Sequence, residues 1–197
     1  MLSLLNSQLP RFRCTLTRMI YLPMKLTARK SGKSDKLDLL RCERPDGSHT
    51  SVSMPRQGIL PHDLIHYVVE QTLGYRHGFL GEVAKGADIA FAMQMSHDLA
   101  QAAPSPELTH AEAIVESLQA QLWSGTFDVA MFDEGVASAC AVRDCAPPVL
   151  APGAGKQLYD AVIVLGQRWQ ALPFHTALTL AMPHLASLPS RAKAPRT

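Results

Sequence analysis

Apolar and polar residues alternate in three short segments near the start of the chain, the pattern of half-buried β-strands. The alternation is regular over residues 24–29 and 50–54 and less regular over residues 36–43. Polar turns separate the segments, the clearest being PDGS at residues 45–48. The pattern therefore predicts a three-stranded antiparallel meander.

From Pro61 onward, apolar residues recur every three or four positions, which predicts helices. Pro61 suits the first helical position, and Gly74 suits the end of that helix. A second start is marked at Ser105 by an N-capping side chain followed by Pro and Glu. The helix over residues 156–172 is the most apolar, so we expect it to be central. The other expected helices cover residues 88–102, 105–124 and 127–143, the last broken at Gly135.

These elements predict an α+β fold, in which the N-terminal meander packs against four to five helices. A short C-terminal strand at residues 178–180 is expected to rejoin the sheet. We expect one domain over residues 24–182 and a disordered basic tail over residues 183–197. Residues 1–23 are rich in Arg and lack acidic residues, which fits an organellar transit peptide. We prefer to interpret them as a disordered extension ahead of a true start at Met24.

Charge is unevenly distributed along the 197 residues. Residues 35–190 hold all 17 acidic residues and 9 of the 19 basic ones, a net charge of about −8 there. This acidic body, residues 35–190, argues against a nucleic-acid partner, whose phosphates are also negative. No apolar run approaches the roughly 20 residues that cross a membrane. The four cysteines form no C-x-x-C pair, which favours reduced thiols and a cytoplasmic location.

One flank of the helix over residues 61–73 carries the most suggestive chemistry. His62 and His66 are one turn apart and Glu70 follows one turn later, with Asp63 beside them. Two histidines at this spacing can bind one metal ion, as in H-E-x-x-H zinc helices. Here Asp63 replaces the Glu that serves as general base in those helices, and its side chain is one methylene shorter. The alternative interpretation is a hydrogen-bonded network at the edge of the core.

Residues 56–70 read RQGILPHDLIHYVVE, and GFLG follows at residues 78–81. These runs resemble a family of small uncharacterised bacterial proteins whose chains open with a short sheet and continue as helices. The resemblance covers about Met24 to Leu180. It implies a bacterial, cytoplasmic setting and a start at Met24, and it implies no activity.

Three functional hypotheses remain open. The first is a non-catalytic binding protein, because no complete catalytic set or cofactor fingerprint is present. Its contact surface would be the His62–Glu70 helix and the Gly-rich segment that follows. An unknown protein partner or small ligand would contact Tyr67, Arg76 and His77 there, and no resident cofactor is expected. A nucleotide is not expected either, because the GAGK run at residues 153–156 lacks the first Gly and the Ser or Thr of a phosphate loop. A weaker variant is a regulator that binds a basic partner through the acidic body.

The other main hypothesis is a hydrolase that depends on a divalent metal such as zinc. His62 and His66 would be ligands, and Glu70 or Asp63 would be a third ligand or a base acting on a bound water. His77 or His97 would complete the site if the fold brings either one close. The sequence leans away from an enzyme, because two histidines supply only half of a tetrahedral site.

Overall fold

A computed structural model describes residues 22–92 and 105–187 of the chain. Its four strands form one antiparallel sheet in the order β3-β2-β1-β4. The strands are β1 (Leu22–Arg29), β2 (Leu37–Glu43), β3 (His49–Pro55) and β4 (Ala177–Ser187). The helices are α1 (His62–Leu73), α2 (Phe79–Ala84), α4 (Pro106–Ser124), α5 (Val129–Val142) and α6 (Ala154–Ala171). The α+β class, the N-terminal meander and the C-terminal strand are therefore confirmed.

Some predicted segments lie outside the described residues. The structure describes helical residues 89–92 at the start of the helix expected over 88–102, and the remainder of that helix lies outside. Most of the expected N-terminal extension and the end of the expected basic tail are outside as well.

β4 is longer than the short strand expected at residues 178–180. It pairs with β1 from Arg29↔Ala177 to Leu22↔Ser187, with a shift in register between Leu22 and Met24. β1 consequently has a hydrogen-bonded neighbour on each side. The pairing of β4 with β1 continues as far as Ser187. The sheet therefore extends past residue 182, where the domain was expected to end.

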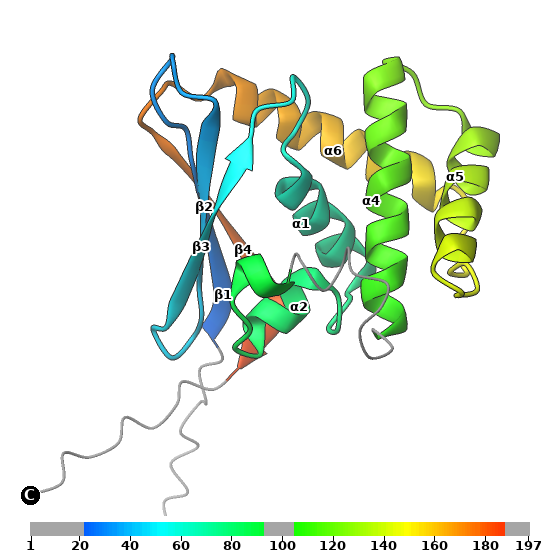
Figure 1. Cartoon of the computed structure of the whole chain (residues 1–197), viewed down its shortest axis with the longest axis horizontal. Coiled ribbons are helices and arrows are strands. Elements are labelled where there is room, and N and C mark those ends of the chain that lie inside the picture. Colours follow the sequence, from blue (N-terminus) through cyan, green and yellow to red (C-terminus); the bar gives the residue numbers. More distant parts are fainter. Residues whose placement is uncertain (1–21, 93–104, 188–197) are drawn as a thin grey trace, which may run out of the picture.

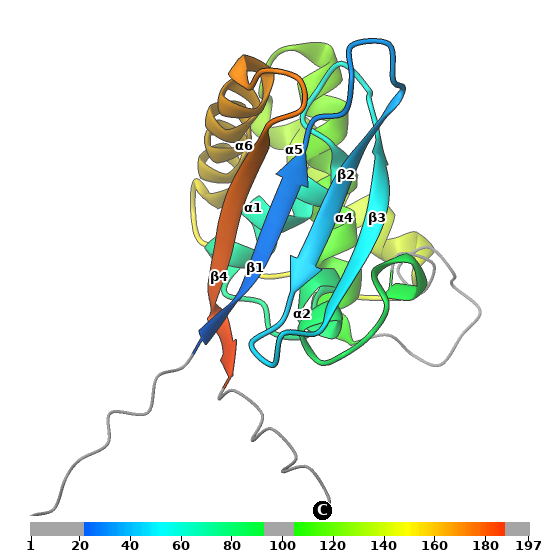
Figure 2. The ribbon, with the colours of Figure 1, turned by 90° about the vertical axis from the view of Figure 1, so that its left-hand side faces the viewer.

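The helices lie on one face of the sheet, and α1 occupies the layer between the sheet and α4 (Figure 1). None of the described helices covers the opposite face (Figure 2). The covered face contributes fully buried side chains to the core, namely Met24, Leu26, Ala28, Leu40, Cys42 and Met54. α1 is therefore surrounded by protein on most sides, with the sheet, α4 and α6 as neighbours.

Capping residues set the helix ends much as the sequence predicted. The Ser105 side chain accepts a hydrogen bond from the Leu108 N–H at 3.2 Å, and Pro106 begins α4. Gly125 and Gly74 end α4 and α1 with φ of 76° and 69°, a left-handed conformation that glycine adopts without strain. Pro61 occupies the N-cap of α1, one position before the predicted one.

Two predictions about the helices were wrong. α5 runs through Gly135 without a break, and the missing side chain leaves room for close packing on α4. A Cβ at Gly135 would lie 2.7 Å from the Ser117 hydroxyl oxygen. The helix expected to be central, α6, runs along one side of the helical layer (Figure 2) and leaves Val164 exposed, whereas α1 contacts α2, α4, α6 and β4.

Candidate metal centre

The polar flank of α1 is buried rather than placed at the edge of the core. His66 is 1% exposed and Glu70 is 0% exposed, because α4 packs over this side of α1. α4 brings a further carboxylate, Glu112, which is also 0% exposed. Burying such groups is costly unless they are paired or bind a cation, so their contacts define what the site can do.

His66 lies at the centre of the buried polar cluster. Its Nε2 atom is 3.1 Å from His62 Nε2 and 3.1 Å from Glu112 Oε2. On the other side of the ring, Nδ1 is 3.3 Å from Glu70 Oε1. Phe79 packs against the ring with a centroid distance of 5.0 Å. The ring is thus held in one orientation, with Nε2 directed at His62 and Glu112.

His62 approaches the same point from the start of α1. Its Nε2 atom is 3.4 Å from Glu112 Oε1, so the Glu112 carboxylate presents one oxygen to each ring. Its Nδ1 atom is 3.0 Å from Gln119 Oε1, and the Gln119 amide donates in turn to Gln57 at 3.3 Å. The His62 side chain is 20% exposed, which gives solvent a route to the cluster.

The partners of the two Nδ1 atoms indicate the tautomers of both rings. Gln119 Oε1 and the Glu70 carboxylate are acceptors, so each Nδ1–H donates. In neutral rings, both Nε2 atoms then carry lone pairs, and these face each other across 3.1 Å beside a carboxylate. A proton shared with Glu112, or a metal ion, would relieve the repulsion between these lone pairs.

The electrostatics of the metal-free cluster are consistent with a bound proton. Burial lowers the pKa of His66, but the Glu112 charge and the hydrogen bonds to Glu112 and Glu70 raise it to about 10. Burial raises the pKa of Glu112, and the His66 charge, with hydrogen bonds from both rings, moves it far below its ordinary value. The Glu112 carboxylate therefore favours the charged form of the buried His66 ring.

The three side chains lie near the spacing of zinc ligands, although one donor atom from each does not reach it for every pair. Ligands of a tetrahedral site with bonds of about 2.0–2.1 Å lie roughly 3.3 Å apart. The two Nε2 atoms are 3.1 Å apart, and each faces a different Glu112 oxygen, at 3.1 Å for His66 and 3.4 Å for His62. One donor atom from each of the three lies within 4.8 Å of the others. Imidazole nitrogens and a carboxylate oxygen are ordinary zinc ligands.

Glu70 contacts the Nδ1 side of the His66 ring. It does not reach the converging atoms, which are the two Nε2 atoms and the Glu112 carboxylate oxygens. Its carboxylate accepts hydrogen bonds from the backbone N–H groups of Leu80 at 3.0 Å and Gly81 at 3.2 Å. A Cβ at Gly78 would lie 2.5 Å from Glu70 Oε2, so this glycine makes room for the carboxylate. Glu70 therefore positions His66 and fixes its tautomer, the usual role of a carboxylate behind a metal-binding histidine.

Asp63 is buried but is not a member of the converging set. It is 2% exposed, and its Oδ1 atom has no hydrogen-bond partner among the residues the structure describes. Burial raises the pKa of its carboxyl group, while the His62 and His66 charges partly oppose that rise.

The predicted contact residues lie apart from the cluster. The Tyr67 hydroxyl points toward β4, 3.5 Å from the Ala181 carbonyl oxygen. The backbone N–H groups of Arg76 and His77 donate to the Glu107 carboxylate at 2.7 and 2.6 Å. His77 is thus not near the converging atoms, and His97, the other remote ligand considered, lies outside the described residues.

Sequence reasoning missed Glu112 and Gln119, although α4 contains a signal for both. Leu108, Val115 and Leu122 form an apolar stripe along α4, and Glu112 and Gln119 fall within it seven residues apart. Both are buried. Two polar residues inside a buried stripe indicate a partner on the facing helix, and here that partner is the histidine pair of α1.

No family model, curated protein or solved structure matches this chain. The resemblance noted for residues 56–70 therefore stays a prediction. Among the described residues, the helices are all too short or too polar to cross a membrane.

Proposed function

We propose that this protein binds one divalent transition-metal ion, with zinc the best fit, through His62, His66 and Glu112. The observation that carries the proposal is the convergence of two imidazole Nε2 atoms and a carboxylate within 3.1–3.4 Å. With each Nδ1–H donating to an acceptor of its own, loss of the Nε2 protons to a metal ion would leave both Nε2 lone pairs directed at the shared point.

The ligand number favours a hydrolytic centre over a structural one. Structural zinc sites are closed by four protein ligands, whereas catalytic sites have three and leave a position for water or substrate. Among the described residues, three side chains form the set, and one of them is partly exposed. Two histidines and a glutamate form the ligand set of several zinc hydrolases. The hydrolase hypothesis therefore takes precedence over the non-catalytic binding hypothesis.

The chain's own residues have distinct roles in this proposal. His62, His66 and Glu112 hold the ion, while Glu70 and Gln119 orient the two rings. The ion would supply an activated water for hydrolysis. Phe79 shields the His66 side of the centre, so substrate would approach past the exposed edge of His62.

The first test is metal content. Protein purified without chelator is analysed by mass spectrometry for bound zinc, iron, manganese and nickel, and again after zinc reconstitution. We expect about one equivalent in the wild type and a large loss in Glu112→Gln, which keeps the shape of the side chain. His110→Ala removes a different histidine from the same helix and should retain the metal.

The second test is activity. Chromogenic ester and phosphoester probes are assayed with the zinc-loaded and zinc-free wild type and with Glu112→Gln. Turnover that depends on zinc and on Glu112 would support the hydrolase. Stoichiometric metal without turnover would leave a metal-binding protein of another kind. Absence of metal after reconstitution would overturn the proposal and leave a buried ion-pair network.

The proposal includes the expected setting in the bacterial cytoplasm, without a nucleic-acid or membrane partner. This part rests on the resemblance of residues 56–70, on the acidic body, and on described cysteines that form no disulfide.

A further inference from the structure

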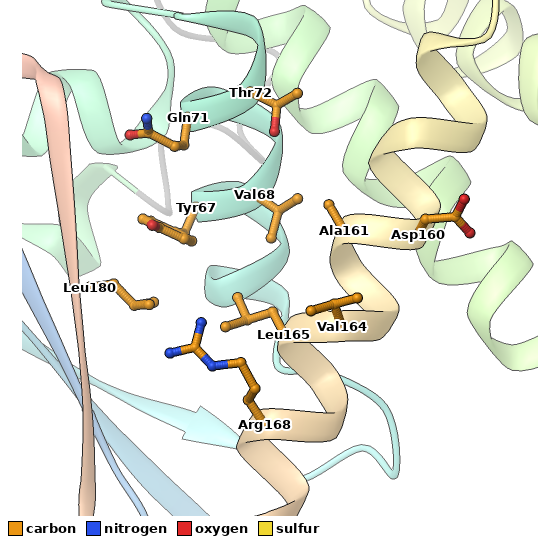
Figure 3. A pocket seen from close by; sticks show the side chains of 10 residues that line it. All are labelled: Tyr67, Val68, Gln71, Thr72, Asp160, Ala161, Val164, Leu165, Arg168 and Leu180. Atoms are coloured by element: carbon orange, nitrogen blue, oxygen red, sulfur yellow. The ribbon is translucent and has the colours of Figure 1, made fainter.

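A cavity on the other side of α1 has no role in the metal centre. It lies between α1, α6 and β4 and has a volume of about 360 Å³ (Figure 3). None of the three proposed metal ligands lines it. Its volume falls in the range of pockets that hold small molecules.

The walls of the cavity are mainly apolar. Val68 from α1, Leu165 from α6 and Leu180 from β4 form its inner side and are largely buried. Ala161 and Val164 continue the wall along α6, and Val164 is 57% exposed. Figure 3 shows these side chains facing a common space. An apolar ligand group placed there would cover surface that the chain leaves open to water.

One cation at the end of the cavity has no counter-charge among the residues that the structure describes. The Arg168 guanidinium turns toward Tyr67 and Leu180 (Figure 3), and it forms no hydrogen bond or ion pair with the described residues. At the opposite end, Asp160 is already paired, because both of its oxygens lie 2.7 Å from Lys156 Nζ. The cavity is thus apolar with one net positive charge at one end.

The Tyr67 hydroxyl supplies a hydrogen-bonding group beside Arg168. Burial raises the pKa of Tyr67, and the nearby Arg168 charge partly opposes that rise. The phenol therefore stays protonated at neutral pH and can donate. Its present contact with the Ala181 carbonyl oxygen is long, at 3.5 Å, so a better acceptor could replace it.

We propose that this cavity binds a small monocarboxylate with an apolar chain, such as a medium-chain fatty acid. The carboxylate would pair with the Arg168 guanidinium, whose fork of N–H donors fits two carboxylate oxygens, and accept from the Tyr67 hydroxyl. The chain would lie along Val68, Leu165 and Val164. The site is independent of the metal centre, because the two use opposite sides of α1.

The test is calorimetric titration with octanoate, octanamide and octylamine at fixed ionic strength. These ligands share a chain and differ in charge. We expect octanoate to bind more tightly than the amide and the amine by about tenfold or more, since hydrogen bonds to charged groups exceed neutral ones. Arg168→Gln should remove that preference while leaving octanamide binding unchanged, and far-UV circular dichroism verifies that the variant is folded.

Two controls separate this site from the rest of the molecule. Arg29→Gln removes an exposed arginine from β1 and should bind octanoate like the wild type. Ala161→Phe fills the apolar wall and should weaken octanoate and octanamide alike. Glu112→Gln should bind octanoate normally, so a failure of the metal proposal would not affect this result. Equal binding of octanoate and octanamide, or full octanoate binding by Arg168→Gln, would overturn the proposal.

Discussion

The Glu70 carboxylate joins the His66 ring to two backbone N–H groups at the start of α2. Changing Glu70 to Gln keeps the size of the side chain but removes the charge that supports the His66 Nδ1–H. Carboxylates in this position typically contribute 10- to 100-fold to metal affinity. We therefore expect Glu70→Gln to weaken zinc binding by about that factor, measured by competition with a chromogenic chelator.

The control for that prediction is Glu82→Gln. Glu82 is a surface carboxylate of α2 that pairs with Lys85 at 2.7 Å. Its removal should leave zinc affinity unchanged. If Glu70→Gln bound zinc as tightly as Glu82→Gln, Glu70 would not position the His66 ring for metal binding.

At the residue scale, the sequence predicted part of the candidate site. The spacing of His62 and His66 placed them on one face of a helix, and the structure brings their Nε2 atoms together. Glu70 shares that face, but only the packing of α2 shows that it supports His66 from behind. Glu112 could not be found by spacing, because it approaches from a helix 46 residues away in the sequence.

At the scale of elements, two glycines inside helices differ in the space around them. An alanine at each position therefore tests helix propensity in one case and helix packing in the other. Gly166 lies inside α6, where an added Cβ would meet only Leu60 Cβ, at an ordinary 3.8 Å. Glycine inside a helix costs about 0.5–1 kcal/mol relative to alanine. Gly166→Ala should therefore raise the free energy of unfolding by about that amount, measured by urea denaturation.

Gly135 provides the matched comparison in α5. An added Cβ there would lie 2.7 Å from Ser117 Oγ, whose hydroxyl donates to the Phe132 carbonyl at 2.9 Å. Gly135→Ala should lower stability, because α5 must move away from α4 or the hydroxyl must turn away. Stabilisation by both substitutions would show that the contact between α4 and α5 has room for a Cβ at Gly135.

An ion pair at the end of the sheet predicts a response to acid. The Asp38 carboxylate, at the start of β2, accepts from Arg56 at 2.6 Å and from the Ser31 N–H at 2.9 Å. Burial raises the pKa of Asp38, but these hydrogen bonds and the Arg56 charge outweigh it, and the pKa ends below the ordinary 3.8. A lowered carboxyl pKa stabilises the fold above about pH 3.8, and this contribution is lost as pH falls through the folded-state value.

Asp38→Asn should therefore cost about 1–3 kcal/mol of stability at pH 7. The deficit relative to the wild type should shrink at pH 3, as measured by urea denaturation at both values. Asp133→Asn, an exposed change on α5, should have little effect at either pH. A constant deficit for Asp38→Asn would mean that its charge is not responsible.

The sequence predicted elements well where local chemistry determines them. The N-cap at Ser105 and the glycine stops at Gly74 and Gly125 are local signals, and all three are observed. The full length of β4 depends instead on pairing with β1, which lies far away in the sequence. The unbroken path of α5 through Gly135 depends likewise on close contact with α4.

At the scale of the whole molecule, the proposed ion would connect two layers of the fold. His62 and His66 belong to the layer on the sheet, and Glu112 belongs to the outer helix α4. Binding to the folded state alone stabilises it by about 2.7 kcal/mol at 100 times the dissociation constant. We expect zinc to raise the melting temperature of metal-free protein by roughly 5–10 °C under those conditions.

The Glu112→Gln variant is the control for this thermal shift. It should melt at the same temperature with and without zinc, as followed by differential scanning fluorimetry in chelator-treated samples. An equal shift in the variant and the wild type would place the stabilising ion elsewhere on the molecule.

Metal binding by His62, His66 and Glu112 is tested most directly by anomalous diffraction at the zinc edge from crystals grown with one equivalent of zinc. We expect one strong peak between α1 and α4. The peak should lie about 2.0–2.2 Å from His62 Nε2, from His66 Nε2 and from a Glu112 oxygen. An ordered cluster without a peak, or zinc bound only at other histidines, would contradict it.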